Sequence, residues 1–281
     1  MASLLALVSS LLWGSADYHA GNLSKRRPSI VVLGVSQAFG LIFGIALILI
    51  SGSWIAPTLD FDGYLVNGVL AGVCGYIGLL CLYAGLASGR MGVVSPISSL
   101  SVLLPLFFAF LVNGDRLAAP VTAGVIAAII GGFLASGPEI SQGLPLRPVL
   151  LALSAALGFG AALTFMAIGS ETSSLMTMVT MRSATFIVSI AIFLKRKNLG
   201  GITTKEIPLL IAIGISDFLA NLLLGVATTK GLVSLAMVLG SLYPIATALL
   251  AFFFLRERLH KAQYFGIVFA VLGVALISAF Q

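Results

Sequence analysis

Charged residues are the scarcest component of this sequence, since Asp, Glu, Lys and Arg make up only 9% of its 281 residues. A soluble domain would carry roughly a quarter. Hydrophobic residues reach 59%, and the mean hydropathy is +1.15. Water cannot solvate a surface with so few charges, so we expect lipid to surround most of the chain. No polar run is long enough to form a domain outside the membrane.

Histidine and cysteine are almost as rare, with two of each. His19 and His260 lie in distant stretches without a His-Glu-x-x-His motif, which argues against a catalytic metal. Cys74 and Cys81 are two helical turns apart, about 10 Å, which is too far for a disulfide. The chain has no phosphate-binding loop and no Gly-x-Ser-x-Gly elbow. We therefore expect no cofactor, no bound metal, no ATP hydrolysis and no enzymatic activity.

The net charge of +6 does not indicate a nucleic-acid partner. Basic residues form short clusters between apolar runs, at 25–27 and 195–197, where positive charge sets membrane orientation. The first twenty residues are apolar but lack the basic start of a secretory signal, so they predict a retained membrane helix.

Ten apolar runs have about the 20 residues that a spanning helix needs. They predict transmembrane helices at 2–22, 30–51, 64–86, 92–112, 118–136, 148–169, 174–194, 207–228, 232–255 and 262–280. The short connections hold nearly all of the charge. A Pro- and Gly-bracketed polar stretch at 137–147 predicts a linker between a first domain, 1–136, and a second, 148–281.

The two halves repeat each other at an offset of 142 positions, which relates 89–136 to 231–278. The identities include Gly89 with Gly231, Leu100 with Leu242, Arg116 with Arg258, Gly124 with Gly266, and Gly131 with Gly273. Each half holds five spans, and five is odd, so the second copy must enter the membrane from the opposite side. Two inverted five-helix repeats are typical of secondary transporters.

Four ionisable residues lie within predicted spans: Asp17, His19, Arg182 and Asp217. Each costs at least about 2.5 kcal/mol at the bilayer centre unless it is paired or hydrated. Asp217 shares a helix face with Asn221 and is either a protonatable, substrate-contacting group or half of a salt bridge with Arg182. Arg182, in turn, either clamps a substrate carboxylate or holds an acidic neighbour. For His19, near the membrane edge, a capping role is the alternative to a proton relay.

Aromatic side chains are the second set of candidates. Asp17 follows Trp13 by one helical turn, and Tyr76, Tyr83 and Tyr243 add rings with hydroxyls. Such rings either pack the helices or line a site for a substrate with apolar or aromatic parts.

Helix breaks form the third set. Ser95-Pro96 and Pro105 interrupt the fourth span, and 241–244 (SLYP) interrupts the ninth. Proline frees a backbone carbonyl, which lipid tolerates only where protein or cavity water satisfies it. Breaks at corresponding places in both halves favour a transporter site, with hydroxyls from Ser95, Ser98, Ser99 and Ser241. A simple packing kink is the alternative.

Several motifs resemble a known family. Trp13-Gly14-Ser15 opens the first half, with Phe159-Gly160-Ala161 at the matching place in the second. An acidic-Arg-Leu hinge precedes the last span of each half, at 115–117 and 257–259. Each hinge is followed by two glycines seven residues apart. Together these features resemble the EamA-type branch of the drug/metabolite transporter superfamily across nearly the whole chain.

This resemblance implies ten helices in two inverted halves and transport without ATP. It implies a central cavity formed mainly by the first four helices of each half, with the fifth and tenth outside it. Members export amino acids and other metabolites, and some move sugars, nucleotide precursors or drugs. An early arginine in the second helix of each half is also implied. Arg182 fits, whereas the first half has Gln37.

The side of the termini is predicted in two ways. The family resemblance implies cytoplasmic termini. The odd-numbered connections, however, hold twelve Lys or Arg residues and the even-numbered ones two, which places both termini outside the cytoplasm. We favour the charge count because it uses this chain's own residues.

We therefore expect a multi-pass secondary transporter of the bacterial inner membrane that exports amino acids or related metabolites. Uptake of sugars or metabolites, and an intramembrane enzyme, are the alternatives. Protons are the candidate coupling ion, with Asp217 as the titrating group, and a monomer or weak homodimer is expected. The predicted substrate-binding residues are Trp13, Asp17, Tyr76, Tyr83, Ser95, Ser99, Arg182, Asp217, Asn221, Ser241 and Tyr243.

Overall fold

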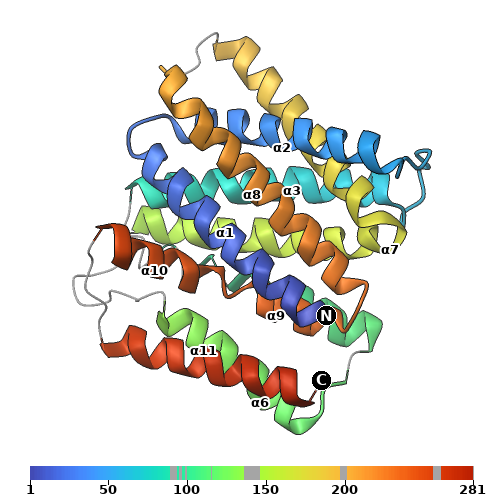
Figure 1. Cartoon of the computed structure of the whole chain (residues 1–281), viewed down its shortest axis with the longest axis vertical. Helices are drawn as coiled ribbons and strands as arrows, with labels where there is room; N and C mark the ends of the chain where they lie inside the picture. Colours follow the sequence, from blue (N-terminus) through green and yellow to red (C-terminus); the bar gives the residue numbers. More distant parts are fainter. Residues whose placement is uncertain are drawn as a thin grey trace.

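The computed structural model describes residues 1–88, 94, 97–98, 100–114, 116–135, 146–196, 201–255 and 261–280. Within these residues the regular structure is entirely helical (Figure 1). The long helices are α1 (Ala2–Ser24), α2 (Ser29–Ser51), α3 (Tyr64–Ser88), α6 (Ala119–Ala135), α7 (Leu146–Arg196), α8 (Ile207–Thr228) and α11 (Lys261–Phe280). The shorter elements are η1 (Leu100–Val102), α5 (Leu103–Phe108), η2 (Ala109–Asn113), η3 (Thr204–Glu206), α9 (Val233–Gly240) and α10 (Tyr243–Leu255).

Four of these helices are long and apolar enough to cross a membrane, by length and composition, within the described ranges. They are Ser29–Ser51, Tyr64–Ser88, Leu146–Lys195 and Thr204–Thr228. Shorter apolar helices occupy four further stretches, beginning at Leu100, Ala119, Val233 and Tyr264. Large apolar side chains are exposed along the outer faces, for example Ile50, Phe107 and Leu157. A surface of this kind suits lipid, and the chain is an integral membrane protein.

The helix α7 contains the sixth and seventh predicted spans. The expected four-residue connection is absent as a loop, because the helical assignment runs on through it. Ser173 alone leaves helical geometry, with φ −167° and ψ 113°. Its Oγ accepts a hydrogen bond from the backbone N–H of Met176 at 3.2 Å, which is the geometry of an N-cap. Ser173 thus ends one helix and starts the next, and the ribbon bends sharply there (Figure 1).

The ninth span is broken where the sequence predicted. It ends as α9 at Gly240 and resumes as α10 at Tyr243. In the first half the 3₁₀ turn η1 precedes α5, and the π-helical turn η2 follows it. Leu100, at the start of η1, is the 142-residue counterpart of Leu242 in the ninth-span break. The described parts of both halves therefore depart from a regular helix at equivalent positions. Ser95-Pro96 lies outside the described residues.

Close helix crossings occur in reciprocal pairs. A Cβ on Gly72 of α3 would collide with the carbonyl of Met181 in α7. A Cβ on Gly214 of α8 would likewise collide with the carbonyl of Ser36 in α2. Gly72 and Gly214 are 142 positions apart, and Ser36 and Met181 are 145 apart. In each half, therefore, an equivalent glycine of the third helix packs against an equivalent turn of the second helix of the other half.

A second pair of crossings follows this rule. Gly14 of α1 approaches the carbonyl of Tyr243 in α10, and Gly160 of α7 approaches the carbonyl of Ser101 in η1. Ser101 and Tyr243 are again 142 positions apart. The first helix of each half thus packs on the broken helix of the other. Small residues allow this approach in membranes, where no hydrophobic force drives helices together.

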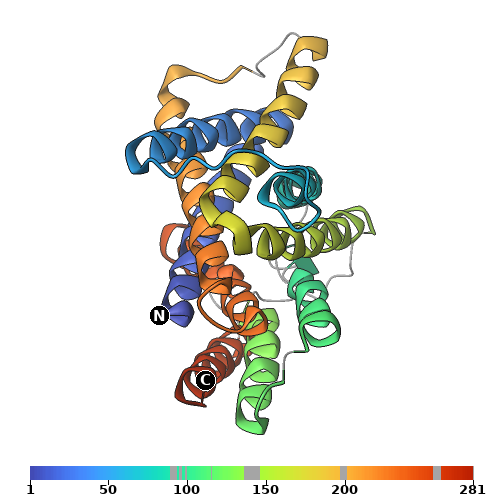
Figure 2. The same cartoon turned by 90° about the vertical axis from the view of Figure 1, so that its right-hand side faces the viewer.

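The helices α6 and α11 form a separate pair at one end of the molecule, as both views show (Figures 1 and 2). Gly131 of α6 packs against the backbone at Ala270, and Gly273 of α11 packs against the backbone at Ala128. Among the described residues, none from either helix lines the central cavity described below. This is the peripheral position that the family resemblance implied for the fifth helix of each half.

Candidate functional site

A cavity lies among α1, α3, α7, α8, η1 and α10, and both halves of the chain contribute to it. About 60 Å³ of it can hold the centre of a water molecule. A water needs about 10–15 Å³ on this measure, so the cavity holds roughly four to six. Six of the predicted site residues line it: Trp13, Asp17, Arg182, Asp217, Asn221 and Tyr243.

At the edge of this cavity Arg182 and Asp217 form a salt bridge. The guanidinium Nη2 donates to the carboxylate Oδ2 at 2.8 Å. Arg182 is 1% exposed and Asp217 is 4% exposed. The predicted pairing is therefore present, and both charges are removed from solvent. Such a pair is stable only when its remaining donors and acceptors are also satisfied.

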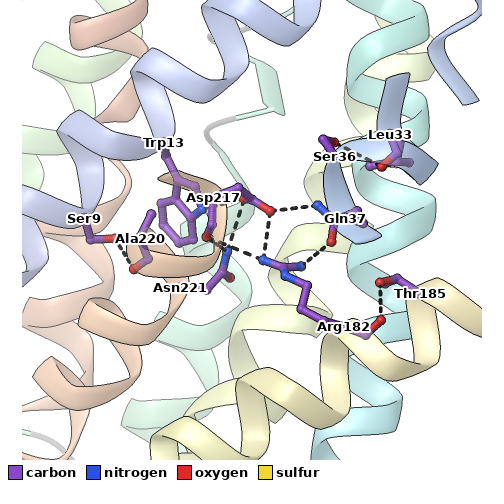
Figure 3. A network of polar contacts seen from close by, with 10 residues as sticks. All are labelled: Ser9, Trp13, Leu33, Ser36, Gln37, Arg182, Thr185, Asp217, Ala220 and Asn221. Carbon is purple, nitrogen blue, oxygen red and sulfur yellow. Dashed lines mark hydrogen bonds and ion pairs between the residues drawn. The ribbon is translucent and has the colours of Figure 1, made fainter. Parts of the chain in front are cut away.

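Three further side chains satisfy the Asp217 carboxylate (Figure 3). Gln37 of α2 donates through Nε2 to Oδ2 at 2.8 Å. Trp13 of α1 donates through Nε1 to Oδ1 at 3.2 Å, and Asn221 donates through Nδ2 to the same oxygen at 3.2 Å. Each carboxylate oxygen thus accepts two hydrogen bonds, and the charge is held in one orientation.

Gln37 also accepts a hydrogen bond from Nη1 of Arg182 at 2.6 Å. It is the member of this cluster that sequence reasoning placed outside the site, noting it only where an arginine was expected. A lone amide in the middle of an apolar span was the signal that could have identified it, because such a group must find a buried partner.

One nitrogen of the guanidinium makes no hydrogen bond to the described residues. Nε of Arg182 is buried and has no hydrogen-bond partner in the described part of the chain. The Thr185 hydroxyl bonds to the carbonyl of Arg182 and so does not use this donor.

Asp17 lines the same cavity in a different state. It is 7% exposed, and no hydrogen bond joins its carboxylate to any described residue. The lining thus contains two carboxyl groups, those of Asp17 and Asp217, against the single guanidinium of Arg182.

Tyr243 begins α10 directly after the break in the ninth span. Its hydroxyl lies 3.1 Å from that of Ser98, and its ring meets Trp13 edge-on, with centroids 6.2 Å apart. The sequence counterpart of Tyr243, Ser101, also lines the cavity. The two broken helices thus contribute equivalent positions to one site.

Three predicted residues do not line the cavity. Tyr76 lines a separate apolar groove between α2 and the second part of α7, where Ser189 donates to its hydroxyl at 3.3 Å. Tyr83 is buried with Leu82 in the core. Ser241 bonds to the carbonyl of Val238 within its own helix end. Ser95 and Ser99 lie outside the described residues.

The apolar walls were largely missed by sequence reasoning. The apolar residues of the lining are Gly75, Leu79, Phe159, Ala162, Leu163 and Met181, and sequence reasoning also missed the polar residue Ser101. Phe159 was identified only as the counterpart of Trp13. Trp13 belongs to the first helix of the first half, and Phe159 to the first helix of the second half. Each half therefore supplies one aromatic ring to the cavity from its first helix. Among the described residues no three His, Cys, Asp or Glu side chains gather into a metal site.

Known proteins share this architecture and sequence pattern. A solved crystal structure that is 19% identical superposes with a TM-score of 0.79, covering 99% of this chain and 96% of that one, and so shares the fold. An uncharacterized protein of Methanocaldococcus jannaschii is 30% identical over 130 residues, which are 46% of this chain and 95% of the relative. That relative is therefore about as long as one half of this chain.

The model of the EamA-like transporter family matches residues 1–137 and again residues 146–279. The two matches together cover nearly the whole chain and leave out residues 138–145 between them. The chain therefore belongs to the EamA-like transporter family.

Proposed function

We propose that this chain is a secondary transporter that exports amino acids or related small metabolites by alternating access. In this proposal ten helices span the inner membrane of a bacterium as two inverted five-helix halves. The reciprocal crossings of α3 with α7 and of α2 with α8 support two halves related by a twofold axis, and an odd number of spans in each half would place that axis in the membrane plane. Export and the substrate class follow what the family resemblance implies.

One observation carries the proposal: a cavity at the junction of the halves contains a buried, hydrogen-bonded ion pair. Trp13 and Gln37 come from the first half, whereas Arg182, Asp217 and Asn221 come from the second. Polar groups inside a membrane are costly and usually mark a substrate or ion path. The hydrogen bonds of this cluster also connect the two halves of the chain, which would have to move relative to each other during alternating access.

The broken helices support the same site. The breaks at η1 and between α9 and α10 lie next to the cavity, because Ser101 of η1 and Tyr243 at the start of α10 both line it. Irregular backbone at membrane depth is tolerated where protein or cavity water satisfies it. Interrupted helices in both halves are also where secondary transporters bind substrate and coupling ions.

A zwitterionic substrate fits the unsatisfied donor of Arg182. A substrate carboxylate could take the Nε–H that has no partner among the described residues, if the side chain turned toward the cavity. An N–H of a charged guanidinium forms a strong hydrogen bond to a carboxylate. Protons remain the proposed coupling ion, and Asp217 was the titrating group predicted from sequence. Its four donors and its salt bridge, however, favour a role in holding Arg182.

Counterflow in proteoliposomes tests this proposal. Vesicles with the purified chain are loaded with one unlabelled amino acid or sugar, and uptake of its radiolabelled form is followed. We expect transient accumulation for a subset of amino acids and none for sugars. Accumulation of sugars alone would favour the alternative substrate class. No accumulation of any compound above protein-free vesicles would contradict the transporter proposal.

The two tryptophans provide a matched control. Trp13→Phe keeps a ring in the cavity wall but removes the hydrogen bond to Asp217. Trp54→Phe changes a residue that is 66% exposed in the connection between α2 and α3. We expect the first variant to reduce counterflow several-fold and the second to leave it unchanged.

A further inference from the structure

Asp17 is a buried carboxylate without a positive partner. It lies on α1 one turn after Trp13, and it faces the central cavity. Asp217 lines the same cavity, so the two carboxylates would repel each other if both were ionised. A buried charge normally has a counter-charge or several hydrogen bonds. Asp17 has neither among the described residues, so its partner must come from elsewhere.

The basic side chains nearby are already engaged. Arg182 uses its two terminal nitrogens on Gln37 and Asp217. His19 is two residues along α1, which turns it to another face, and its ring packs against Tyr18 with centroids 5.1 Å apart. Arg27, beyond the end of α1, pairs with Glu206 at 2.9 Å. None of these groups neutralises Asp17.

The walls around Asp17 are aromatic. Trp13 shares its helix face, Tyr243 packs edge-on against Trp13, and Phe159 lines the same cavity from α7. Aromatic rings attract organic cations through their negative faces, most strongly when water is excluded. A carboxylate among three rings therefore matches an ammonium group attached to an apolar body.

We infer that Asp17 binds the positively charged ammonium group of the transported ligand, while Asp217 positions Arg182 and does not contact that group. The inference rests on the proposed transport function and names its substrate class. Ligands are amines or amino acids, and acids or neutral compounds without an ammonium group are excluded. The ammonium group of such a ligand would neutralise Asp17 when that carboxylate is ionised.

A proton is the other positive partner that Asp17 can take. Proton and ammonium then exclude each other at one carboxylate. The titratable or charged groups that line the cavity with Asp17 are Asp217 on α8, Arg182 on α7 and Tyr243 on α10. On α3 the buried titratable group near them is Tyr83. Gln37 of α2, which bonds to Asp217 and Arg182, does not titrate, and α9 has no titratable side chain. We therefore expect amine affinity to fall as the pH is lowered.

Ligand-induced stabilisation tests the inference on the purified full chain in detergent. The probes share a phenyl body: phenethylamine is the cation, L-phenylalanine the zwitterion, 3-phenylpropionate the anion and 2-phenylethanol the neutral compound. Isobutylamine and methylamine cover smaller sizes. A ligand that binds the folded state raises its apparent melting temperature. We expect at least one amine to raise it and the acid and alcohol to leave it unchanged.

Variants assign the effect to Asp17. Asp17→Asn should abolish the rise caused by the amine and remove its pH dependence, whereas Asp17→Glu should retain part of both. Asp60→Asn removes a carboxylate from the exposed connection between α2 and α3 and should behave as the wild type. An unchanged amine effect in Asp17→Asn overturns the inference. So does a wild-type protein that no amine stabilises, or that the acid stabilises as strongly.

This assay separates the two proposals because binding in detergent needs no transport. Amine binding that depends on Asp17, without counterflow in vesicles, would contradict the transport function alone. Counterflow of compounds without an ammonium group, at the same rate in Asp17→Asn, would contradict the role of Asp17 alone.

Discussion

Gln37 of α2 and Arg182 of α7 meet at 2.6 Å, from Oε1 to Nη1, although each stands at the same place in its own half of the chain. They are 145 positions apart, the same spacing that relates Ser36 to Met181 at the reciprocal crossings. Two residues at equivalent positions of the two halves contact each other only where both lie next to the twofold axis that relates the halves. The replacement of one arginine by glutamine lets them form a hydrogen bond where two guanidinium groups would repel.

Removing one charge of the Arg182–Asp217 ion pair should lower the stability of the protein more than removing both charges together. Arg182→Leu leaves the Asp217 charge unpaired, and Asp217→Leu leaves the guanidinium unpaired, each at about 3–5 kcal/mol. The double variant, with both charges gone, should lose less than the sum of the two. Unfolding in mixed micelles gives the free energies and their coupling. Additive losses would mean that the two side chains do not stabilise each other.

Gln37→Leu should destabilise the protein by about 1.5–3 kcal/mol, because it removes hydrogen bonds to two charged groups. The same substitution should cost much less in the background without Arg182 and Asp217. Equal losses in both backgrounds would assign the effect to packing of α2. The free energy of unfolding of the four variants distinguishes the two cases.

The sequence predicted the helical membrane fold, most helix bounds and the break in the ninth span, because apolar run length and proline act locally. It also named a salt bridge of Arg182 with Asp217 as one of two alternatives, since opposite charges in lipid stabilise each other, and the structure contains that ion pair. It did not predict that Gln37 would complete the pair. That depends on how α2 crosses α8, which is set by the approach of Gly214 to Ser36 rather than by any local pattern.

The tyrosines show the limit of arguing from residue type. Tyr243 lines the cavity because it follows a helix break. Tyr76 and Tyr83 belong to the unbroken helix α3 and do not line the cavity. Helical spacing alone does not tell a ring that faces the cavity from one that faces the core, since both faces of α3 are apolar. Asp17 and Asp217 were both predicted as site residues. Only the structure shows that hydrogen-bond donors surround the carboxylate of Asp217.

The paired glycines should be equally intolerant of a side chain. Gly72→Ala and Gly214→Ala each place a methyl group against a backbone carbonyl of the opposite half. Overpacking of this kind costs about 1–3 kcal/mol. Val73→Ala, at a neighbouring residue that is 42% exposed, is the control and should cost little. A large loss for Gly72 with none for Gly214 would contradict reciprocal crossings. Thermal unfolding in detergent measures all three variants.

Labelling of single cysteines should decide the orientation of the chain. After Cys74 and Cys81 are replaced by alanine, one cysteine is introduced at Lys25 in the first connection or at Leu59 in the second. Because positive charge is retained in the cytoplasm and the odd-numbered connections carry most of it, we expect the first position to be inside. Leu59→Cys should then react with a membrane-impermeant maleimide in intact bacterial cells, and Lys25→Cys only after the cells are opened. The reverse pattern would place both termini in the cytoplasm, as the family resemblance implies, and would show that the acidic second connection does not determine the topology.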